Sequence, residues 1–312
     1  MPRPHLIVNP ASANGRTGRH FDSIARAVRA VVGDFEWAFT RRRGDGAVLA
    51  RQAVAAGSRL VVAVGGDGTA SEVVDGIAAV NHPDVLFGFI PRGTGGDLKR
   101  SIGAPANTRD AALALRGGER VCDLGRVELT GRDGRPQVRH FANVAGCGID
   151  GRVVELVDGA SKALGGAVAF QIASARALLG WVDQPVRWRL DGGPWREEPI
   201  TCIAVCNGRF FGGGMMVAPG ARMDDGLFDV TVWQGYGIAD FLLHRKKLYD
   251  GSHVQLPKTR TFRAREVEIE PAAGARVLLD VDGEGPGVLP ARFSILPGAL
   301  RLKVPEPGRR TG

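Results

Sequence analysis

Along the first third of the chain, short apolar runs typical of strands alternate with segments in which apolar positions recur at helical spacing. Apolar runs at 5–9, 59–66 and 85–91 and the segment "FEWAFT" at 35–40 are typical of strands. Segments with helical periodicity lie near 19–32, 46–56 and 70–80. Because the strands are apolar throughout and alternate with helices, the pattern predicts a doubly wound parallel sheet with both faces covered.

The pattern changes after about Val121. Segments with strand character, separated by Asp-Gly and Gly-Gly turns, lie at 122–130, 137–150, 185–193, 198–208, 226–233 and 266–271. We expect one helix among them, around 164–179. This part is predicted to be a second, mostly antiparallel β domain. The last apolar segment, 293–305, is compatible with pairing inside that domain or with a return to the first.

Composition and net charge indicate which kinds of molecule this protein binds. Of 312 residues 44% are hydrophobic, enough for a substantial core, and the net charge of +8 predicts an anionic partner. Aromatic residues make up 6% and are not interleaved with the basic clusters, so we expect no nucleic-acid partner. No apolar run is long enough to span a bilayer, and the start of the chain lacks a signal peptide, so a cytoplasmic protein is expected. The four scattered cysteines are expected to be reduced and buried rather than zinc ligands.

Glycine-rich loops follow three of the four predicted strands of the first domain, at 9–18, 65–69 and 92–97. The carboxyl ends of parallel strands lie at one edge of the sheet, and open α/β sheets bind their ligands there. The sequence contains neither G-x-x-x-x-G-K-[ST] nor a convincing G-x-G-x-x-G. Two phosphate-type loops on neighbouring strands nevertheless predict a nucleotide site.

The loop 65–69 reads Gly-Gly-Asp-Gly-Thr. Glycine permits positive φ and lets a bulky anion approach the backbone amides, while the following helix start offers free N–H groups. A carboxylate beside a phosphate is repulsive without a cation, and Mg²⁺ near Asp67 would resolve that conflict. The alternative is a tight strand-to-helix turn with Asp67 as a helix cap.

Two acidic segments of the second domain are candidates for chemistry. Asp224-Asp225-Gly226 reads as a turn before a strand, or as a cation site made by one carboxylate and backbone carbonyls. Asp280, Asp282 and Glu284 are expected at strand spacing on one face, where three acids repel unless they serve a cation or a base. Asp282-Gly283 is equally compatible with a hairpin turn.

Six segments, taken in order along the chain, resemble the diacylglycerol kinase catalytic-domain family of lipid kinases, which shares its nucleotide-site architecture with NAD kinase and phosphofructokinase. They are "VNP" at 8–10, "GGDGT" at 65–69, "PRGTGGD" at 91–97, "NVAGCGID" at 143–150, "NGRFFGGGMMVAPGARMDDGLFDV" at 207–230 and "VDGE" at 281–284. The resemblance implies an N-terminal α/β domain over 1–121, to which about 293–312 return, and a C-terminal antiparallel β-sandwich domain over 122–292. It also implies that ATP lies in the interdomain cleft.

The resemblance also implies roles for individual residues. Asp282 matches the proposed general base with Glu284 beside it, and Asp67 is its rival for that role. Asp225 matches a Mg²⁺ ligand, helped by the backbone carbonyls of Arg222 and Leu227. The expected ATP contacts are Asn9, Pro10, Thr40, Gly65, Gly66, Asp67, Gly68, Thr69, Gly93, Thr94 and Gly95.

The sequence therefore predicts an ATP- and Mg²⁺-dependent lipid kinase that phosphorylates a lipid hydroxyl of a diacylglycerol-like or sphingoid-like acceptor. Candidates for apolar contacts with that lipid are Met215, Met216, Phe210 and Phe211. The basic surface predicts peripheral association with an anionic membrane, and the resemblance also allows for a homodimer. The alternatives are a soluble kinase like NAD kinase and a non-catalytic nucleotide-binding regulator. The family commonly has Asn where this chain has Gly96, so that side chain's contact is missing here.

Overall fold

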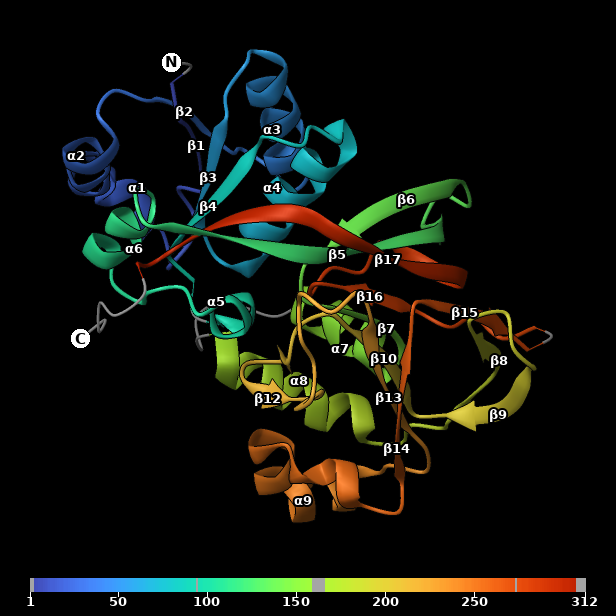
Figure 1. The fold of residues 1–312 in the computed structure, drawn as a ribbon. Helices are drawn as coiled ribbons and strands as arrows, with labels where there is room; N and C mark the ends of the chain where they lie inside the picture. Colours follow the sequence, from blue (N-terminus) through green and yellow to red (C-terminus); the bar gives the residue numbers. More distant parts are fainter. Residues whose placement is uncertain (1–2, 94, 159–165, 273, 307–312) are drawn as a thin grey trace. The chain divides into compact units, whose positions relative to one another are not determined.

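The chain divides into two units, shown in the computed structural model of Figure 1. The structure describes residues 3–93, 95–158, 166–272 and 274–306. The first unit comprises Met1–Cys122 and Gly298–Gly312, and the second comprises Asp123–Pro297. Strands β5 (Gly118–Gly131) and β17 (Gly287–Val304) belong partly to each unit.

A parallel sheet with the strand order β2-β1-β3-β4 forms the centre of the first unit. The last part of β17 extends it, pairing in parallel with β4 at Arg301↔Leu86. Helices α3 and α4 contact each other on one face of this sheet, and α2 and α6 on the other (Figure 1). The predicted doubly wound α/β architecture is confirmed. The strands are β1 (His5–Val8), β2 (Glu36–Phe39), β3 (Leu60–Gly65) and β4 (Leu86–Pro91).

The helices of the first unit follow the predicted alternation with two differences. Helix α4 begins at Asp67 rather than at 70, because Gly66 is its extended N-cap, so Asp67, Gly68 and Thr69 form its first turn. Helices α1 and α6 have no counterpart in the prediction, which placed a loop over 9–18. The helices are α1 (Arg16–Arg19), α2 (Phe21–Val32), α3 (Asp45–Ala55), α4 (Asp67–Val80), α5 (Asp97–Ile102) and α6 (Thr108–Ala114).

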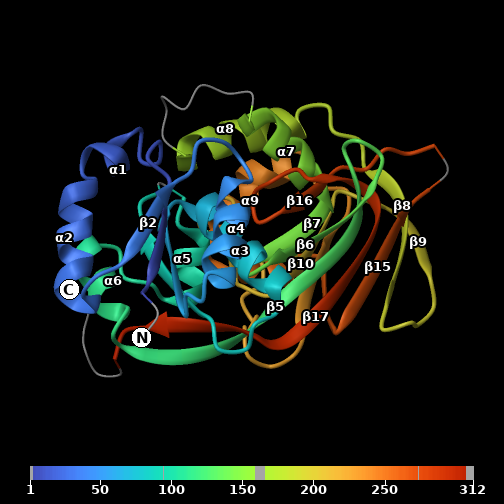
Figure 2. The same cartoon turned by 90° about the horizontal axis from the view of Figure 1, so that it is seen from above.

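Two large antiparallel sheets form the body of the second unit, as Figure 2 shows from above, and β11 and β12 pair as a small third sheet. One has the order β14-β13-β10-β7-β16, and the other joins β17, β15, β8 and β9, with β5 and β6 paired beside β17. Their facing side chains, among them Phe141, Trp188 and Ile203, form one buried core. The predicted β-sandwich is confirmed. The remaining strands are β6 (Pro136–Phe141), β7 (Val144–Gly148), β8 (Gln184–Leu190), β9 (Arg196–Ile200), β10 (Cys202–Cys206), β11 (Phe210–Phe211), β12 (Met215–Met216), β13 (Phe228–Trp233), β14 (Thr259–Ala264), β15 (Glu266–Pro271) and β16 (Leu279–Val281).

In the described part of the second unit three α-helices are present, rather than the single one predicted. They are α7 (Ile149–Asp158), α8 (Gly166–Leu178) and α9 (Ile238–Asp250), and a short 3₁₀ helix at Ser252–Gln255 follows α9. The predicted helix at 164–179 corresponds to α8, and its first two residues lie outside the described part. All four cysteines are free and buried, as expected. Among the described helices none combines the length and the apolarity needed to cross a membrane.

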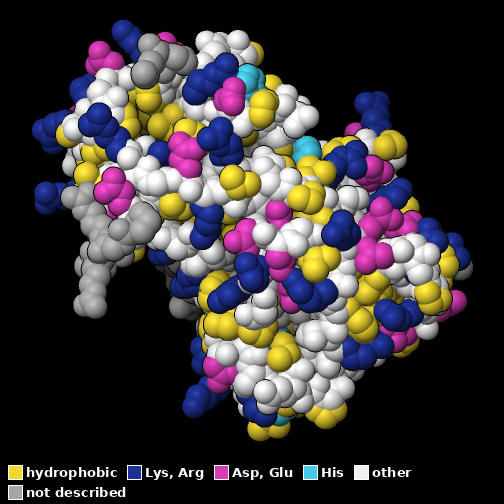
Figure 3. Space-filling view, in the orientation of Figure 1, with side chains coloured by type: hydrophobic (Ala, Val, Ile, Leu, Met, Phe, Trp, Pro, Cys, Tyr) yellow, Lys and Arg dark blue, Asp and Glu magenta, His cyan; other side chains and the backbone are white. Residues whose placement is uncertain are grey.

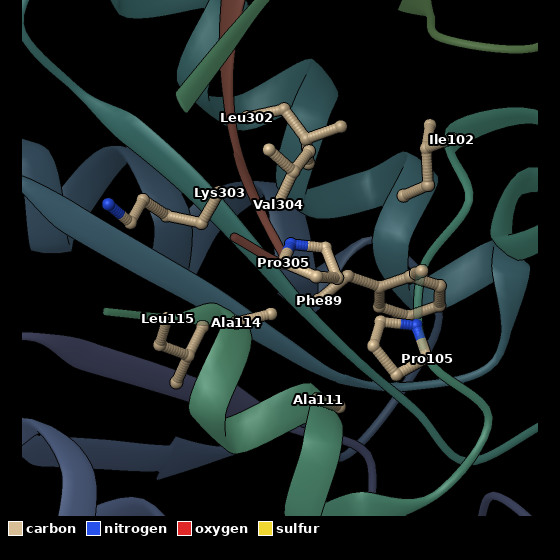
Figure 4. A pocket seen from close by; sticks show the side chains of 11 residues that line it. Phe89, Ile102, Pro105, Ala111, Ala114, Leu115, Leu302, Lys303, Val304 and Pro305 are labelled. Atoms are coloured by element: carbon tan, nitrogen blue, oxygen red, sulfur yellow. The ribbon is translucent and has the colours of Figure 1, made fainter. Parts of the chain in front are cut away.

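A small pocket in the first unit lies between α6, the end of α5 and the end of β17 (Figure 4). Its lining is apolar apart from one lysine and contains none of the residues predicted for the nucleotide. It is therefore separate from the candidate site. The lining residues are Phe89, Ile102, Ala104, Pro105, Ala111, Ala114, Leu115, Leu302, Lys303, Val304 and Pro305.

Candidate active site

The residues predicted to contact ATP lie at the carboxyl ends of the parallel strands of the first unit. Asn9 and Pro10 follow β1, Thr40 follows β2, and Gly65 ends β3. Gly93 and Gly95 follow β4, while Thr94 lies outside the described residues. Because the strands are parallel neighbours, the topology gathers these residues at one edge of the sheet.

The glycines of the two loops let the loops touch each other. A Cβ on Gly93 would lie 2.6 Å from the Cα of Gly66, and one on Gly65 would lie 2.5 Å from the Thr69 hydroxyl oxygen. Positive φ is not the reason for the glycines of loop 65–69, since none of them has it, and that part of the expectation was wrong. Gly65 and Gly93 are needed because backbone approaches side chain or backbone too closely there for a Cβ.

A hydrogen bond connects the end of β1 to the first turn of α4. The amide Nδ2 of Asn9 donates to Oγ1 of buried Thr69 over 3.1 Å. The backbone N–H of Ala11 donates to the other side-chain atom, Oδ1 of Asn9. The Asn9 side chain is thereby fixed, and it holds the start of α4, whose free N–H groups form the expected anion site, against β1.

Asp67 ties the loop after β3 to the start of α5. Its Oδ2 accepts the backbone N–H groups of Gly96 (2.6 Å) and Asp97 (3.0 Å). The cap of α4 is Gly66, so Asp67 does not cap its own helix as the alternative interpretation held. Gly96 has φ +72°, and its backbone N–H makes this contact where the family commonly has Asn.

The second carboxylate oxygen of Asp67, Oδ1, is buried and has no hydrogen-bond partner among the residues that the structure describes. A buried carboxylate oxygen without a partner is costly unless a cation or water satisfies it. Oxygen ligands of this kind suit Mg²⁺. The residues around Asp67 therefore fit the magnesium ion that the sequence predicts beside the phosphates.

In the second unit Asp282 lies in the tight turn that follows β16. Asp282 and Gly283 both have positive φ (50° and 84°), and Val281 and Glu284 exchange backbone hydrogen bonds across them, which defines a type I′ turn. The Asp282 carboxylate folds back and accepts three backbone N–H groups, those of Ala142, Asn143 and Val144. The hairpin interpretation is thus confirmed, and the carboxylate is held rigidly.

The segment 142–144 connects Asp282 to the glycine-rich motif at 207–216. Nδ2 of Asn143 donates to the carbonyl of Phe210, and Nδ2 of fully buried Asn207 donates to the carbonyl of Ala142. Three motifs that lie far apart in the sequence are therefore in contact around one carboxylate. Of the proposed lipid contacts, Met215 is buried in the core of this unit and Phe211 stacks on Trp233.

The three acids at 280–284 do not share one strand face, because β16 ends at Val281. That expectation was wrong, and each carboxylate has its own surroundings. Buried Glu284 pairs with Arg139, whose Nη2 lies 3.0 Å from Oε2. Oδ1 of Asp280 accepts the N–H of Gly283 over 2.7 Å and so supports the turn that carries Asp282.

Both oxygens of the Asp225 carboxylate have protein partners. Oδ1 accepts the N–H of Leu227 over 3.2 Å, and Oδ2 is paired with Arg263. Among the described residues no group of three or more His, Cys, Asp or Glu side chains is placed to hold a metal ion. The residues around Asp225 therefore do not fit a cation unless Arg263 moves away. The proposed carbonyl ligands Arg222 and Leu227 stay predictions.

Asp150 and Asp280 form a second acidic pair behind the turn. Asp280 is the register partner of Gly146 across β16 and β7, and a Cβ on Gly146 would lie 2.6 Å from Oδ2 of Asp150. The Asp150 carboxyl thus occupies the space beside Asp280. Burial raises the pKa of Asp150 to about 7 and, together with the charge of Asp150, raises the pKa of Asp280 well above its usual range. We infer that the pair retains a proton near neutral pH.

The variant Asp150→Asn is expected to stabilise the protein more at pH 8 than at pH 5. A carboxyl whose pKa is raised on folding contributes stability below the unfolded value, about 4, which is lost as the pH rises through the folded value, here about 7. Asn remains neutral throughout, so the extra gain at pH 8 should be about 1–3 kcal/mol. Thermal melts at the two pH values measure it, with exposed Asp133→Asn as the control. A gain that is equal at both pH values would contradict the assignment.

Sequence reasoning missed three residues that build this region: Asp123, Arg139 and Asp150. Asp123 is buried, and its Oδ2 accepts the N–H of Gly226 while its own N–H donates to Met223. A signal was present, since Asp123 stands between Cys122 and Leu124, and Asp150 directly follows the apolar and glycine run 144–149. A charged residue in such a run is buried only when it has partners.

The fold is a doubly wound α/β unit with glycine-rich loops at the carboxyl edge of its sheet, together with a β-sandwich unit, and comparisons identify the family. The model of the diacylglycerol kinase catalytic domain matches residues 3–127, and the model of the YegS C-terminal NAD kinase beta sandwich-like domain matches residues 143–304. The chain therefore belongs to the diacylglycerol kinase family of lipid kinases.

Individual relatives cover most of the chain. A diacylglycerol kinase of Mycobacterium tuberculosis is 32% identical over 266 residues, which are 85% of this chain and 82% of that protein. A diacylglycerol kinase of Bacillus subtilis is 27% identical and covers 98% of this chain and 97% of its own length. A crystal structure of a diacylglycerol kinase from Bacillus anthracis superposes with a TM-score of 0.72 at 23% identity over 97% of both chains, which shows the same fold.

Proposed function

We propose that this protein is an ATP- and Mg²⁺-dependent lipid kinase that transfers the γ-phosphoryl group of ATP to the hydroxyl of a diacylglycerol-like lipid. Family membership supports kinase activity, and the names of the relatives support this acceptor over a sphingoid base. The observation that carries the proposal is the buried Oδ1 of Asp67 at the start of α4, which no described residue hydrogen-bonds.

In the proposed reaction the first unit binds the nucleotide. The 14-residue helix α4 begins directly after β3, so the free N–H groups of its first turn favour the phosphates. Asn9 and Thr69 fix this turn by their hydrogen bond. Mg²⁺, held with the help of Asp67, would offset the charge of the phosphates.

Asp282 is the proposed general base. Three backbone N–H groups orient its carboxylate, and the residue is only half-buried. The lipid hydroxyl would give its proton to Asp282 as its oxygen bonds to the γ-phosphorus, and the bond from that phosphorus to the β–γ bridging oxygen would break to release ADP.

The decisive experiment incubates the purified protein with γ-labelled ATP, Mg²⁺ and a total lipid extract, and then identifies the labelled lipid. We expect a phosphorylated product with the chromatographic behaviour of phosphatidic acid, absent when Mg²⁺ is chelated. A labelled product made only from added NAD would instead assign the protein as a NAD kinase. ATP binding without transfer to any lipid or to NAD would assign it as a nucleotide-binding regulator.

A further inference from the structure

Four apolar side chains of the second unit are more exposed than any other large hydrophobic residue in the described part of the chain. Their exposed fractions are 78% for Leu243, 75% for Val182, 74% for Leu179 and 63% for Leu242, against 52% for the next, Val121. Leu242 and Leu243 lie on α9, and Leu179 and Val182 directly follow α8, which contacts α9. Exposed apolar residues gathered in this way mark an interaction site.

Basic residues are interleaved with these side chains at helical spacing. Lys246 and Lys247 follow Leu242 and Leu243 by four residues each, and all four are exposed. A spacing of four residues places side chains on one helix face. Together with Leu179 and Val182 these four residues make up what we call the α8–α9 surface. Lys246 and Lys247 form no ion pair with any described residue, so their charge is available to a partner.

The end of α8 repeats this arrangement. Ile172, Arg176 and Leu179 follow one another at spacings of four and three residues and are all exposed. Alternation of apolar and basic side chains therefore continues from α9 onto the neighbouring helix. In Figure 3 yellow and dark-blue side chains lie next to one another in the lower part of the view, where Figure 1 shows α9.

The opposite side of α9 holds the helix in place. Phe241 and Leu248 are buried in a core that also contains Trp233 and Tyr236. The side chain of Asp240, in the first turn of α9, accepts the N–H of Gly237 and is paired with Lys258. Because these contacts anchor its inner face, α9 presents the two leucines outward on a rigid support.

The composition of the α8–α9 surface matches a bilayer better than a protein partner. Protein interfaces are depleted of lysine at their core, where desolvating the ammonium group is costly. At a membrane surface the leucines enter the acyl boundary while the lysine stems extend and keep their charge near the lipid phosphates. The interleaved pattern is therefore complementary to lipids with anionic headgroups.

We propose that the α8–α9 surface docks this protein onto bilayers that contain anionic lipids, with Leu242 and Leu243 inserted and Lys246 and Lys247 at the headgroups. The inference rests on the proposed function, because a lipid acceptor has to be reached at a membrane. It adds to that function by assigning the docking surface to named residues of the second unit.

Vesicle sedimentation with the full chain tests the proposal. The probes are vesicles of phosphatidylcholine with about 30% phosphatidylglycerol and vesicles of phosphatidylcholine alone. The first kind carries the negative surface charge that should attract the lysines. The double variant Leu242→Gln/Leu243→Gln should bind the anionic vesicles about 10-fold more weakly or worse, since two inserted side chains are lost. Lys246→Gln/Lys247→Gln should also bind more weakly and should lose part of the salt dependence of the wild type.

A matched control removes an exposed valine and an exposed basic residue from β6 and the turn before it, through Val138→Gln and Arg135→Gln, and should bind as the wild type. The melting temperatures of all variants should agree to about 2 °C, because surface substitutions change stability little. Equal binding by the leucine variant and the wild type would overturn the proposal. So would a wild type that does not bind anionic vesicles, which would favour a protein partner instead.

A second readout separates this proposal from the proposed function. On a short-chain diacylglycerol dispersed in detergent, the leucine variant should keep the full activity of the wild type, because no bilayer has to be reached. A wild type that binds vesicles through this surface but phosphorylates no lipid would leave the docking proposal in place and overturn the kinase. If the protein phosphorylates lipid but the leucine variant binds vesicles like the wild type, the kinase proposal stands and the docking proposal is overturned.

Discussion

The variant Asp282→Asn is expected to lower kcat by about 10²–10⁴-fold, the usual contribution of a general base. Asn cannot accept the proton of the acceptor hydroxyl. Binding of ATP should change little, since Asp282 belongs to the second unit and the predicted nucleotide contacts to the first. Steady-state kinetics with saturating lipid give kcat, and the KM for ATP serves as the internal check.

The structure also gives Asp282 a structural role, which the experiment has to separate from catalysis. Oδ2 accepts the N–H of Ala142, and in the variant a side-chain NH₂ group would face that donor, at a cost of about 1–3 kcal/mol. Asp191 supplies a matched control, because it also has positive φ (49°) and accepts two backbone N–H groups, those of Arg265 and Glu266. Asp191→Asn should affect stability only.

The pH dependence of kcat distinguishes the two roles of Asp282. If Asp282 is the base, its replacement abolishes the acidic limb of the pH–rate profile of the residual activity. A residue that only orders segment 142–144 would lower the rate and leave the limb in place. Near-full turnover by Asp282→Asn would refute the assignment and would favour Asp67 as the base.

The first unit could be predicted closely from the sequence because its strands and helices have clean periods. The runs around Val61–Val64 are apolar at every position, as a strand buried on both faces requires, and they are fully buried. The start of α4 was misplaced because glycine at 66 and 68 reads as loop, whereas only Gly66 lies outside the helix. Local composition therefore predicts the presence and type of an element better than the residue at which it begins or ends.

Helix α9 was not predicted, because its exposed leucines hide the helical pattern of apolar residues. Leu242 and Leu243 face solvent, so the apolar positions of 238–250 do not fall on one stripe. Helical periodicity is visible only when the apolar face is the buried one. A helix that offers leucines to something other than the core of its own chain breaks that pattern.

The contacts of the candidate site depend on pairing that no single segment encodes. Asp282 meets residues 142–144 because β16 pairs antiparallel with β7 in the register Val281↔Ala145. A shift of one residue would turn Asp280 away from Asp150 and toward the core. The sequence motifs indicated which residues matter, whereas their hydrogen-bond partners follow from the strand register.

The variant Asp67→Asn is expected to lower kcat/KM by about 100-fold or more, through loss of a carboxylate that helps to hold Mg²⁺. The substitution is well matched to the structure. One side-chain oxygen, Oδ2, accepts both N–H groups, from Gly96 and Asp97, and the carboxamide oxygen of Asn can do the same. The NH₂ group then takes the place of the unpartnered Oδ1, so charge is removed while the loop contact is kept.

A control for this substitution lies in the same unit. One oxygen of Asp45 likewise accepts two backbone N–H groups, those of Arg41 and Arg42, at the start of α3. Asp45→Asn should leave the kinetics of the enzyme unchanged, because the contact is of the same kind but Asp45 is not among the residues expected to bind ATP or Mg²⁺.

Nucleotide binding and the Mg²⁺ requirement of activity distinguish the two hypotheses for Asp67. If its carboxylate lies beside the phosphates and is neutralised by Mg²⁺, then Asp67→Asn binds metal-free ATP at least as tightly as the wild type, because a like-charge repulsion is gone. The same variant then needs a higher Mg²⁺ concentration for half-maximal activity. If Asp67 only joins two loops, neither quantity moves, because its two hydrogen bonds survive in the variant. An unchanged Mg²⁺ requirement together with full activity would thus remove Asp67 from the chemistry and leave it as the tie between loop 65–69 and α5.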